Sequence, residues 1–173
     1  MTDQKGWYGS PRRIQVFALG IMTLYVGGLL CVWIAAPTLQ FDAYPTECPE
    51  NSQNCTRIAP NPHRGNGEES ITINASKEEV MAEITSWIES QSRTVIVTES
   101  ENVGYIHSVF RSFTWRFPDD MLFHVECDNG SAVIWVHSEA RLGASDLGVN
   151  DDRALSFNDH INSTEWTNST CEE

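Results

Sequence analysis

The feature that most constrains this chain is a long apolar run near its start. Residues 14–36 contain no charged side chain and few polar ones. At a rise of about 1.5 Å per residue, a helix of this length spans the hydrocarbon core of a bilayer, which is about 30 Å thick. We therefore expect a single transmembrane helix that contacts membrane lipid. A cleaved signal sequence is the alternative, because Ala35-Ala36 precedes Pro37.

The charges on either side of this run predict its orientation. Three basic residues precede it, whereas Asp42 and Glu47 are the first charged residues after it. Positive charge favours the cytoplasmic side of a membrane. The sequence therefore predicts a single-pass protein of the cell membrane, with residues 1–13 in the cytoplasm and everything after Pro37 outside it.

The segment after the apolar run is strongly acidic. The whole chain has a net charge of -13, and from Pro37 onward 23 acidic residues face 8 basic ones. Such a surface repels phosphate groups, which argues against nucleic acid as a partner and against close adhesion to anionic lipid. Only two lysines occur. A surface rich in carboxylates and poor in lysine is typical of halophilic proteins, and an ordinary acidic protein is the alternative.

The cysteines fit an oxidising compartment. Cys48 and Cys55 lie in a segment rich in Pro, Asn and Ser, where a local disulfide, free thiols and a metal site are all open. A metal site needs more ligands than this pair supplies, and His63 alone does not complete one. Cys127 lies in a predicted strand and is expected to be buried, whereas Cys171 lies in a polar tail and has no predicted role.

The rest of the chain divides into three parts. We expect residues 37–69 to be an irregular linker or cap, residues 70–161 an α+β domain, and residues 162–173 a disordered polar tail. A short strand at residues 70–74 precedes a capping box formed by Ser76 and Glu79, which predicts the start of a helix. That helix has one apolar stripe, formed by Val80, Met81, Ile84, Trp87 and Ile88.

Four further strands are predicted from runs of β-branched and aromatic residues, at 94–98, 105–113, 121–127 and 132–138. Asn129-Gly130 suits a two-residue hairpin turn, and this turn would place residue 127 opposite 132 and residue 122 opposite 137. One face of the hairpin is then wholly apolar and forms the core. The other face is mixed, carries His124 and His137, and is the candidate working face.

The predicted fold class is therefore α+β, a small antiparallel sheet with one or two helices packed on one face, preceded by the single N-terminal transmembrane helix. A final short helix is expected after Asn150, which is a plausible N-cap. Leu155 is the clearest apolar anchor of this helix.

The block from Ser138 to Asn150 packs turn-forming and charged residues between a strand and this final helix. In a functional interpretation, six residues converge to hold a polar ligand or a hard cation such as calcium or magnesium. In a structural interpretation, Arg141 pairs with Asp120 or Asp146, glycines supply turns and Asn150 caps the helix. The candidate ligand-binding residues are Asp119, Asp120, Arg141, Ser145, Asp146 and Asn150.

Several short motifs together resemble one protein family. They are Cys48-Pro49, Asn54-Cys55, Tyr105-Ile106-His107, Asp119-Asp120 with Phe123, and the run from Ser138 through Arg141 to Asn150. These motifs look like the family called domain of unknown function 1499. The resemblance covers roughly residues 48–161. It implies a membrane-attached or exported protein of prokaryotes or plastids, and it implies no activity or cofactor.

We expect an accessory or binding module of the cell envelope, with an envelope protein as a possible partner. The alternative is a membrane-anchored hydrolase or metal-dependent enzyme that uses Asp119, Asp120, His124 and His137. Two patterns that would favour the alternative are missing, since the chain has no Gly-x-Ser-x-Gly elbow and no close His-x-x-x-His pair.

Overall fold

A computed structural model describes residues 11–37, 41 and 43–172. The chain divides into two compact units, Met1–Pro37 and Thr38–Glu173. In the first unit, helix α1 (Pro11–Ala35) is long and apolar enough over Arg12–Ala35 to cross a membrane. The predicted apolar helix is confirmed, and by length and composition it suits a membrane anchor or a signal sequence. Most of the predicted cytoplasmic segment, residues 1–10, lies outside the described residues.

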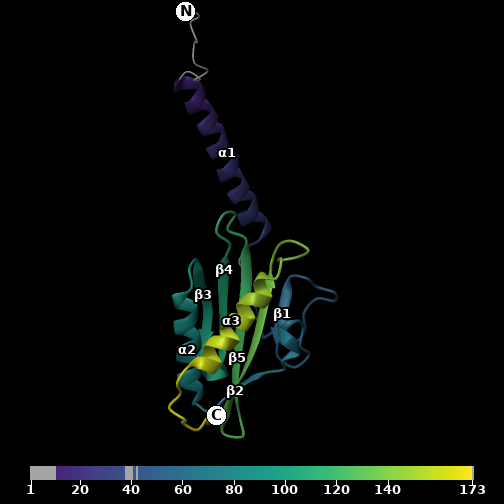
Figure 1. The fold of residues 1–173 in the computed structure, drawn as a ribbon, viewed down its shortest axis with the longest axis vertical. Helices are drawn as coiled ribbons and strands as arrows, with labels where there is room; N and C mark the ends of the chain where they lie inside the picture. Colours follow the sequence, from purple (N-terminus) through teal and green to yellow (C-terminus); the bar gives the residue numbers. More distant parts are fainter. Residues whose placement is uncertain (1–10, 38–40, 42, 173) are drawn as a thin grey trace, which may run out of the picture. The chain divides into compact units, whose positions relative to one another are not determined.

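The second unit is built on one antiparallel sheet (Figure 1). The strands in the described part of the chain follow the order β1-β6-β5-β4-β3, and β2 also pairs with β6, beyond the end of β1. The predicted α+β class and antiparallel sheet are confirmed. The six strands are β1 (Cys55–Ile58), β2 (Ile71–Ile73), β3 (Thr94–Ser100), β4 (Tyr105–Arg111), β5 (Pro118–Asp128) and β6 (Ser131–Ala140).

The β5–β6 hairpin has the register that its turn predicts. Asn129 and Gly130 both have positive φ angles, 50° and 83°, as a type I′ turn requires. Leu122 pairs with His137 across the two strands, and Cys127 pairs with Ala132. Because side chains alternate along a strand, this register fixes which residues of both strands face the core.

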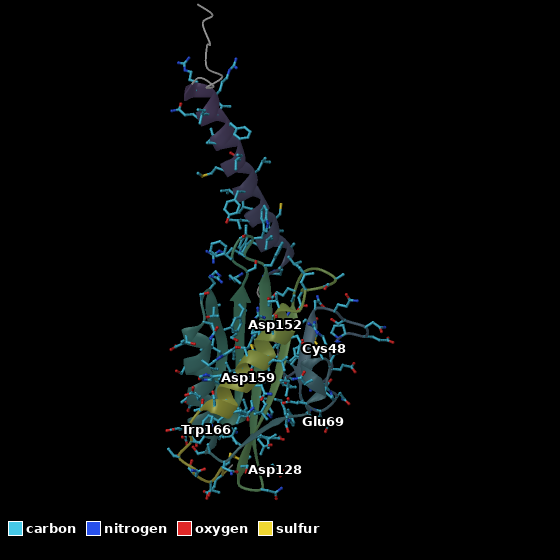
Figure 2. All side chains as sticks on the ribbon, viewed as in Figure 1. Cys48, Glu69, Asp128, Asp152, Asp159 and Trp166 are labelled. Carbon is cyan, nitrogen blue, oxygen red and sulfur yellow. A yellow bond between two sulfur atoms is a disulfide. The ribbon has the colours of Figure 1, made fainter. Side chains whose placement is uncertain are left out.

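Helices α2 (Lys77–Ser90) and α3 (Val149–Ser163) pack on one face of the sheet, and α3 runs across it (Figure 1). We call this the helix face. The acidic side chains of Asp152 and Asp159 on α3 are exposed (Figure 2). The largest fully buried side chains of the core are Ile58, Met81, Ile84, Ile88, Ile106, Met121, Phe123, Ile134, Phe157 and Ile161.

Helix α2 begins as predicted. The Ser76 hydroxyl oxygen accepts a hydrogen bond from the Glu79 backbone N–H at 3.2 Å. All five residues of the predicted apolar stripe are buried. The second half of the capping box is absent, because the Glu79 carboxylate accepts hydrogen bonds from Thr167 and Ser169 instead. The N-terminus of α2 is therefore capped by its own serine and tied to the C-terminal segment.

Helix α3 differs from the prediction at both of its named residues. Its N-cap is Gly148, whereas Asn150 lies inside the helix and is fully buried. Leu155 is only half-buried, and the helix packs instead through Ala154, Phe157 and Ile161. The predicted N-cap and anchor were wrong because α3 begins two residues earlier than expected, and Ala154 faces the core in place of Leu155.

The segment expected to be an irregular linker, residues 37–69, contributes to the sheet. Strand β1 pairs with the end of β6, from Cys55 opposite Glu139 to Ile58 opposite Val136. All four residues of β1 are buried, although the strand includes Thr56 and Arg57. This strand was not predicted, because a strand that is buried on both faces shows no alternation of polar and apolar residues.

The expected disordered tail is also different. A disulfide joins Cys171 to Cys127 at the end of β5, and the Cys171 backbone N–H donates to the Gly130 carbonyl at 2.9 Å. Trp166 packs against the hydrophobic core (Figure 2). The described residues after α3 therefore lie on the domain, held by a covalent bond that the polar composition of the tail does not reveal.

Candidate functional site

The six candidate residues lie on both sides of the sheet. Asp119 and Asp120 are neighbours on β5, so their side chains project to opposite faces. Asp119 pairs with Phe110 and faces the helices, whereas Asp120 pairs with Val109 and lies on the opposite surface, which we call the outer face. The two carboxylates therefore do not form one ligand set, and the candidates separate into three clusters.

The first cluster lies on the outer face and is closed. Arg141 binds Asp120 through two hydrogen bonds, from Nε at 2.7 Å and from Nη2 at 2.6 Å. His107 Nε2 lies 2.7 Å from Asp120 Oδ1. Burial raises the pKa of Asp120, but the hydrogen bonds from Arg141 and His107 outweigh it and lower the pKa below its usual value. Asp120 is 2% exposed, so this carboxylate is an ionised, fully used anchor.

The second cluster joins the helix face to α3. Arg153 Nη2 donates to Asp119 Oδ2 at 2.9 Å, and its Nη1 donates to Asn150 Oδ1 at 2.7 Å. Ser138 Oγ donates to the same Asn150 oxygen at 2.6 Å. Burial raises the pKa of Asp119, although Arg153 opposes the shift. Asn150 also donates to the carbonyl of Asn54, the residue before β1, so its amide group links α3 to β6 and to the start of β1.

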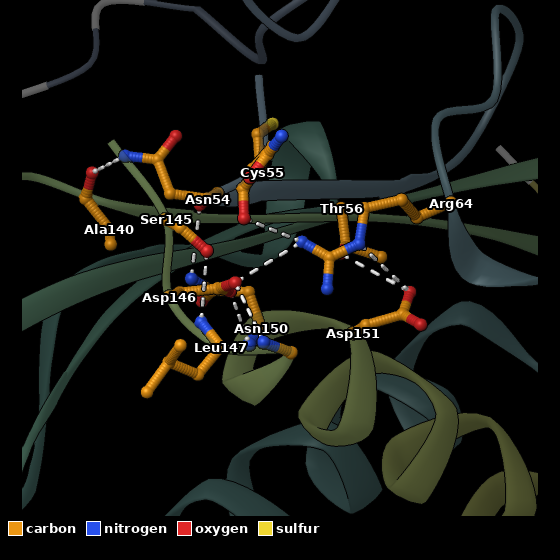
Figure 3. A network of polar contacts seen from close by, with 12 residues as sticks. Asn54, Cys55, Thr56, Arg64, Ala140, Ser145, Asp146, Leu147, Asn150 and Asp151 are labelled. Carbon is orange, nitrogen blue, oxygen red and sulfur yellow. Dashed lines mark hydrogen bonds and ion pairs between the residues drawn. The ribbon is translucent and has the colours of Figure 1, made fainter. Parts of the chain in front are cut away.

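The third cluster surrounds Asp146 at the start of α3 (Figure 3). Its carboxylate accepts hydrogen bonds from the backbone N–H groups of Gly148 at 3.0 Å and Asn150 at 2.7 Å. Arg64 Nη1 donates to the same carboxylate at 3.2 Å. Asp146 therefore does the capping that was predicted for Asn150. Ser145 stands apart from the arginine pairs, and its hydroxyl oxygen accepts a hydrogen bond from the nearby Leu147 N–H at 3.3 Å.

Every candidate carboxylate is thus paired with an arginine, namely Asp119 with Arg153, Asp120 with Arg141 and Asp146 with Arg64. A calcium or magnesium ion needs carboxylate oxygens that are free to bind it. Such pairs are what the structural interpretation predicts, in which the block from Ser138 to Asn150 stabilises the loop between β6 and α3. They also separate the residues of the enzyme alternative, since Asp119 lies on the other face from Asp120.

An open cavity lies elsewhere on the outer face. Its volume is about 390 Å³, which is within the usual range for small-molecule sites. One wall comes from the segment that precedes β1, and the other comes from β3, β4, β5 and the turn before β4. The lining residues are Phe41, Ala43, Tyr44, Thr98, Ser100, Val103, Tyr105 and His124.

Two tyrosines of this cavity carry unsatisfied polar atoms. The hydroxyl groups of Tyr44 and Tyr105 are buried and have no hydrogen-bond partner among the described residues. The Tyr44 ring also contacts His124, Trp135 and His137, with ring centroids 5.9, 6.0 and 6.4 Å away. A buried hydroxyl without a partner costs about 1–3 kcal/mol. The fold keeps two such groups at one site, which is a feature that stability alone does not explain.

The described residues that line the cavity are neutral at physiological pH. Burial raises the pKa of Tyr105 to about 12, with a contribution from the negative charge of Asp120. Burial also raises the pKa of Tyr44, and Arg57 beside its ring opposes this only in part. Burial lowers the pKa of His124, so this imidazole is uncharged. Among the described lining residues none carries a formal charge, which suits an apolar ligand with one or two hydrogen-bonding groups.

Part of this surface was expected from the sequence. The mixed face of the hairpin and His124 were predicted, but Tyr44 and Phe41 were not, because they lie in the segment expected to be a linker. Arg153 and Arg64, the partners of two candidate aspartates, were not predicted either. The only signal in the sequence was composition, since these are two of only eight basic residues after Pro37.

The fold and these clusters define a small α+β protein with an apolar N-terminal helix and a disulfide-bonded domain. Residues 46–161 match the family described as protein of unknown function (DUF1499), and the chain belongs to this family. The resemblance found in the sequence is thereby confirmed. No curated protein and no solved structure matches the chain.

Proposed function

We propose that this protein is a membrane-anchored, extracytoplasmic binding module that holds a small, uncharged and mainly apolar ligand in the outer-face cavity. The observation that carries the proposal is the cavity of about 390 Å³ with the unpartnered hydroxyl groups of Tyr44 and Tyr105. A ligand that contributes one hydrogen-bonding group would satisfy these hydroxyls, and its apolar part would contact Phe41 and Val103.

The ligand class follows from the chemistry of the lining. Phosphates and carboxylates need a positive partner, and the described lining residues offer neutral tyrosines, hydroxyls and a neutral imidazole. The strongly acidic surface further disfavours anionic ligands, including nucleic acid. An uncharged molecule pays little desolvation cost on entering such a site.

The location outside the cytoplasm is supported by the cysteines and by the flanking charges. Cys48 is bonded to Cys55 and Cys127 to Cys171, and such bonds persist in oxidising compartments. Arg12 lies at the start of α1, on the side that the positive-inside rule assigns to the cytoplasm. Membrane lipid is then a partner through residues 14–36, and a protein of the envelope is the proposed recipient or donor of the ligand.

Cavity occupancy is tested by photolabelling of the full-length chain in membranes with an uncharged, aromatic diazirine. We expect labelled peptides that contain Tyr44 or Tyr105, with labelling of α1 by the same membrane-dissolved probe as internal standard. A Val103→Trp variant fills the cavity entrance and should abolish this labelling. Val95→Trp is the matched control, because Val95 is an exposed residue of β3 that does not line the cavity. Equal labelling of both variants would refute the assigned site.

Topology is tested with a membrane-impermeant maleimide. Glu89 is an exposed residue of α2, and a Glu89→Cys variant should react in intact cells. A Thr2→Cys variant should react only after lysis, and the unmodified chain reports any reaction of its own thiol at Cys31. Reaction of the position 2 variant in intact cells would reverse the orientation. Loss of residues 1–36 from the mature chain would establish a signal sequence instead.

A further inference from the structure

A second group of reactive side chains lies at the edge where β1 meets β6, outside the cavity described above. The sulfur atoms of Cys48 and Cys55 and a ring nitrogen of His137 all lie within 4.8 Å of one another. The sequence offered only the two cysteines for this site, and the fold adds a histidine 82 residues away from Cys55 in the chain.

The separations between these atoms resemble those around a tetrahedral metal ion. His137 Nε2 lies 3.7 Å from Cys55 Sγ and 3.3 Å from Glu139 Oε2. With zinc bonds of about 2.3 Å to sulfur and 2.0–2.2 Å to nitrogen or oxygen, tetrahedral geometry places nitrogen about 3.6 Å from sulfur and about 3.4 Å from oxygen. Both separations on the sheet are therefore close to those of bound ligands.

We propose that the reduced form of this protein binds one Zn²⁺ ion through Cys48, Cys55, His137 and Glu139. In the oxidised form the two cysteines form a disulfide, so their sulfur atoms are not available as thiolates. A dithiol reductant transfers two electrons and two protons to this bond and becomes a disulfide itself. Zinc then displaces the two thiol protons, which pass to solvent.

Three of the four proposed ligands lie on the sheet, and the fourth, Cys48, lies in a loop. Cys55 and Glu139 are direct partners across β1 and β6, and His137 lies two residues before Glu139 on the same strand. Cys48 belongs to the preceding loop and is only half-buried. After reduction its sulfur can therefore move to the separation of about 3.8 Å that two zinc-bound thiolates require, while the sheet holds the other three ligands.

The surroundings favour entry of a reductant and a cation. A cavity of about 640 Å³ lies beside the disulfide and is lined by Glu47, Cys48, Pro49, Glu50 and Glu139. Its three carboxylates attract a divalent cation. His137 is fully buried, so packing on the sheet fixes the position of its ring.

The test uses Co²⁺ as a spectroscopic substitute for Zn²⁺ and the full-length chain in detergent, reduced with a phosphine under argon. We expect one Co²⁺ per chain, with the absorption bands of a tetrahedral thiolate complex, displaced by one equivalent of Zn²⁺. Air oxidation should release the ion. His137→Gln should weaken binding by more than about tenfold, since even the outer partners of metal-bound histidines contribute 10–100-fold.

Two controls keep the result interpretable. A Cys48→Ser, Cys55→Ser variant keeps the thiols of Cys31, Cys127 and Cys171, so thiolate bands of equal strength in this variant would overturn the assignment. His160→Gln removes a histidine of α3, on the other side of the sheet, and should leave the affinity for Co²⁺ unchanged. If circular dichroism shows that the His137→Gln variant is unfolded, the test uses Glu139→Gln in its place, because Glu139 is only half-buried. This variant should bind Co²⁺ severalfold more weakly. A reduced wild-type chain without Co²⁺ bands refutes the site and leaves the ligand cavity untouched.

Discussion

The two disulfides provide a quantitative test of the fold. In the chain-entropy model, a cross-link stabilises the folded state by restricting the unfolded chain, and the gain grows with the length of the closed loop. The Cys127–Cys171 bond joins residues 44 positions apart, and the Cys48–Cys55 bond joins residues 7 positions apart. At 25 °C these loops correspond to about 4.0 and about 2.4 kcal/mol.

We therefore expect the Cys127→Ala, Cys171→Ala variant to lose about 1.6 kcal/mol more stability than the Cys48→Ala, Cys55→Ala variant, about a fifteenfold difference in the unfolding equilibrium constant. Urea unfolding of the full-length oxidised proteins in detergent measures both losses. The urea dependence of the free energy should also steepen in each variant, because a chain without its cross-link exposes more surface on unfolding.

Hydrogen exchange adds a local readout for the same pair of variants. Thr167 and Ser169 donate hydrogen bonds to the carboxylate of Glu79 on α2. Loss of the Cys171 disulfide should release this segment and raise the hydrogen-exchange rate of its amides. The variant of the short loop should leave this exchange unchanged. A larger stability loss for the short loop, or no change of exchange in the C-terminal segment, would refute the reasoning.

Three further predictions follow from the buried polar groups and the glycines. Asp120→Asn should cost about 3–5 kcal/mol at pH 7, because a buried guanidinium loses its carboxylate. Folding lowers the pKa of Asp120, so this carboxylate stabilises the folded state fully above its unfolded-state pKa, and the stabilisation is lost as the pH falls towards its folded-state pKa. The free energy of unfolding should therefore fall less steeply with decreasing pH in the variant than in the unmodified protein. Gly104→Ala should prevent folding or lower the free energy of unfolding several times more than Gly67→Ala. Both glycines have positive φ, but a Cβ at Gly104 would lie 1.9 Å from the Val125 carbonyl oxygen. Similar melting temperatures of the two variants would contradict this prediction. Tyr105→Phe should raise the free energy of unfolding by about 1 kcal/mol and weaken photolabelling of the cavity, and a loss of stability would show that its hydroxyl is satisfied.

Local sequence patterns predicted the elements whose signals are contained in short segments. The hairpin from β5 to β6 is one example, because Asn129-Gly130 adopts the left-handed backbone that a type I′ turn needs, and that turn alone sets the register. The start of α2 at Ser76 is another, because the capping serine and the apolar stripe lie within fourteen residues. Strand β1 was missed because its four residues are buried together with two polar side chains.

The candidate site was less predictable. The pairing of Arg141 with Asp120 was one of the two pairings expected from the sequence, but the partners of Asp119 and Asp146 were not expected, since Arg153 and Arg64 come from other parts of the chain. Asp119 and Asp120 were expected to converge on one ligand, but their side chains point to opposite sides of the sheet, as adjacent residues of a strand do. The cavity escaped detection because Tyr44 belongs to a segment without periodicity.

By itself, the sequence determined the apolar N-terminal helix, the antiparallel sheet with its helix-covered face, and the net charge of -13. Each of these depends on the order of neighbouring residues or on the total charge. Only the tertiary structure decided that Cys171 bonds to Cys127, that Asp119 pairs with Arg153 and Asp146 with Arg64, and that His137 lies beside Cys55. The physical reason is that these contacts join distant segments, and the alternation of side chains in a strand does not say which other segment will cover them.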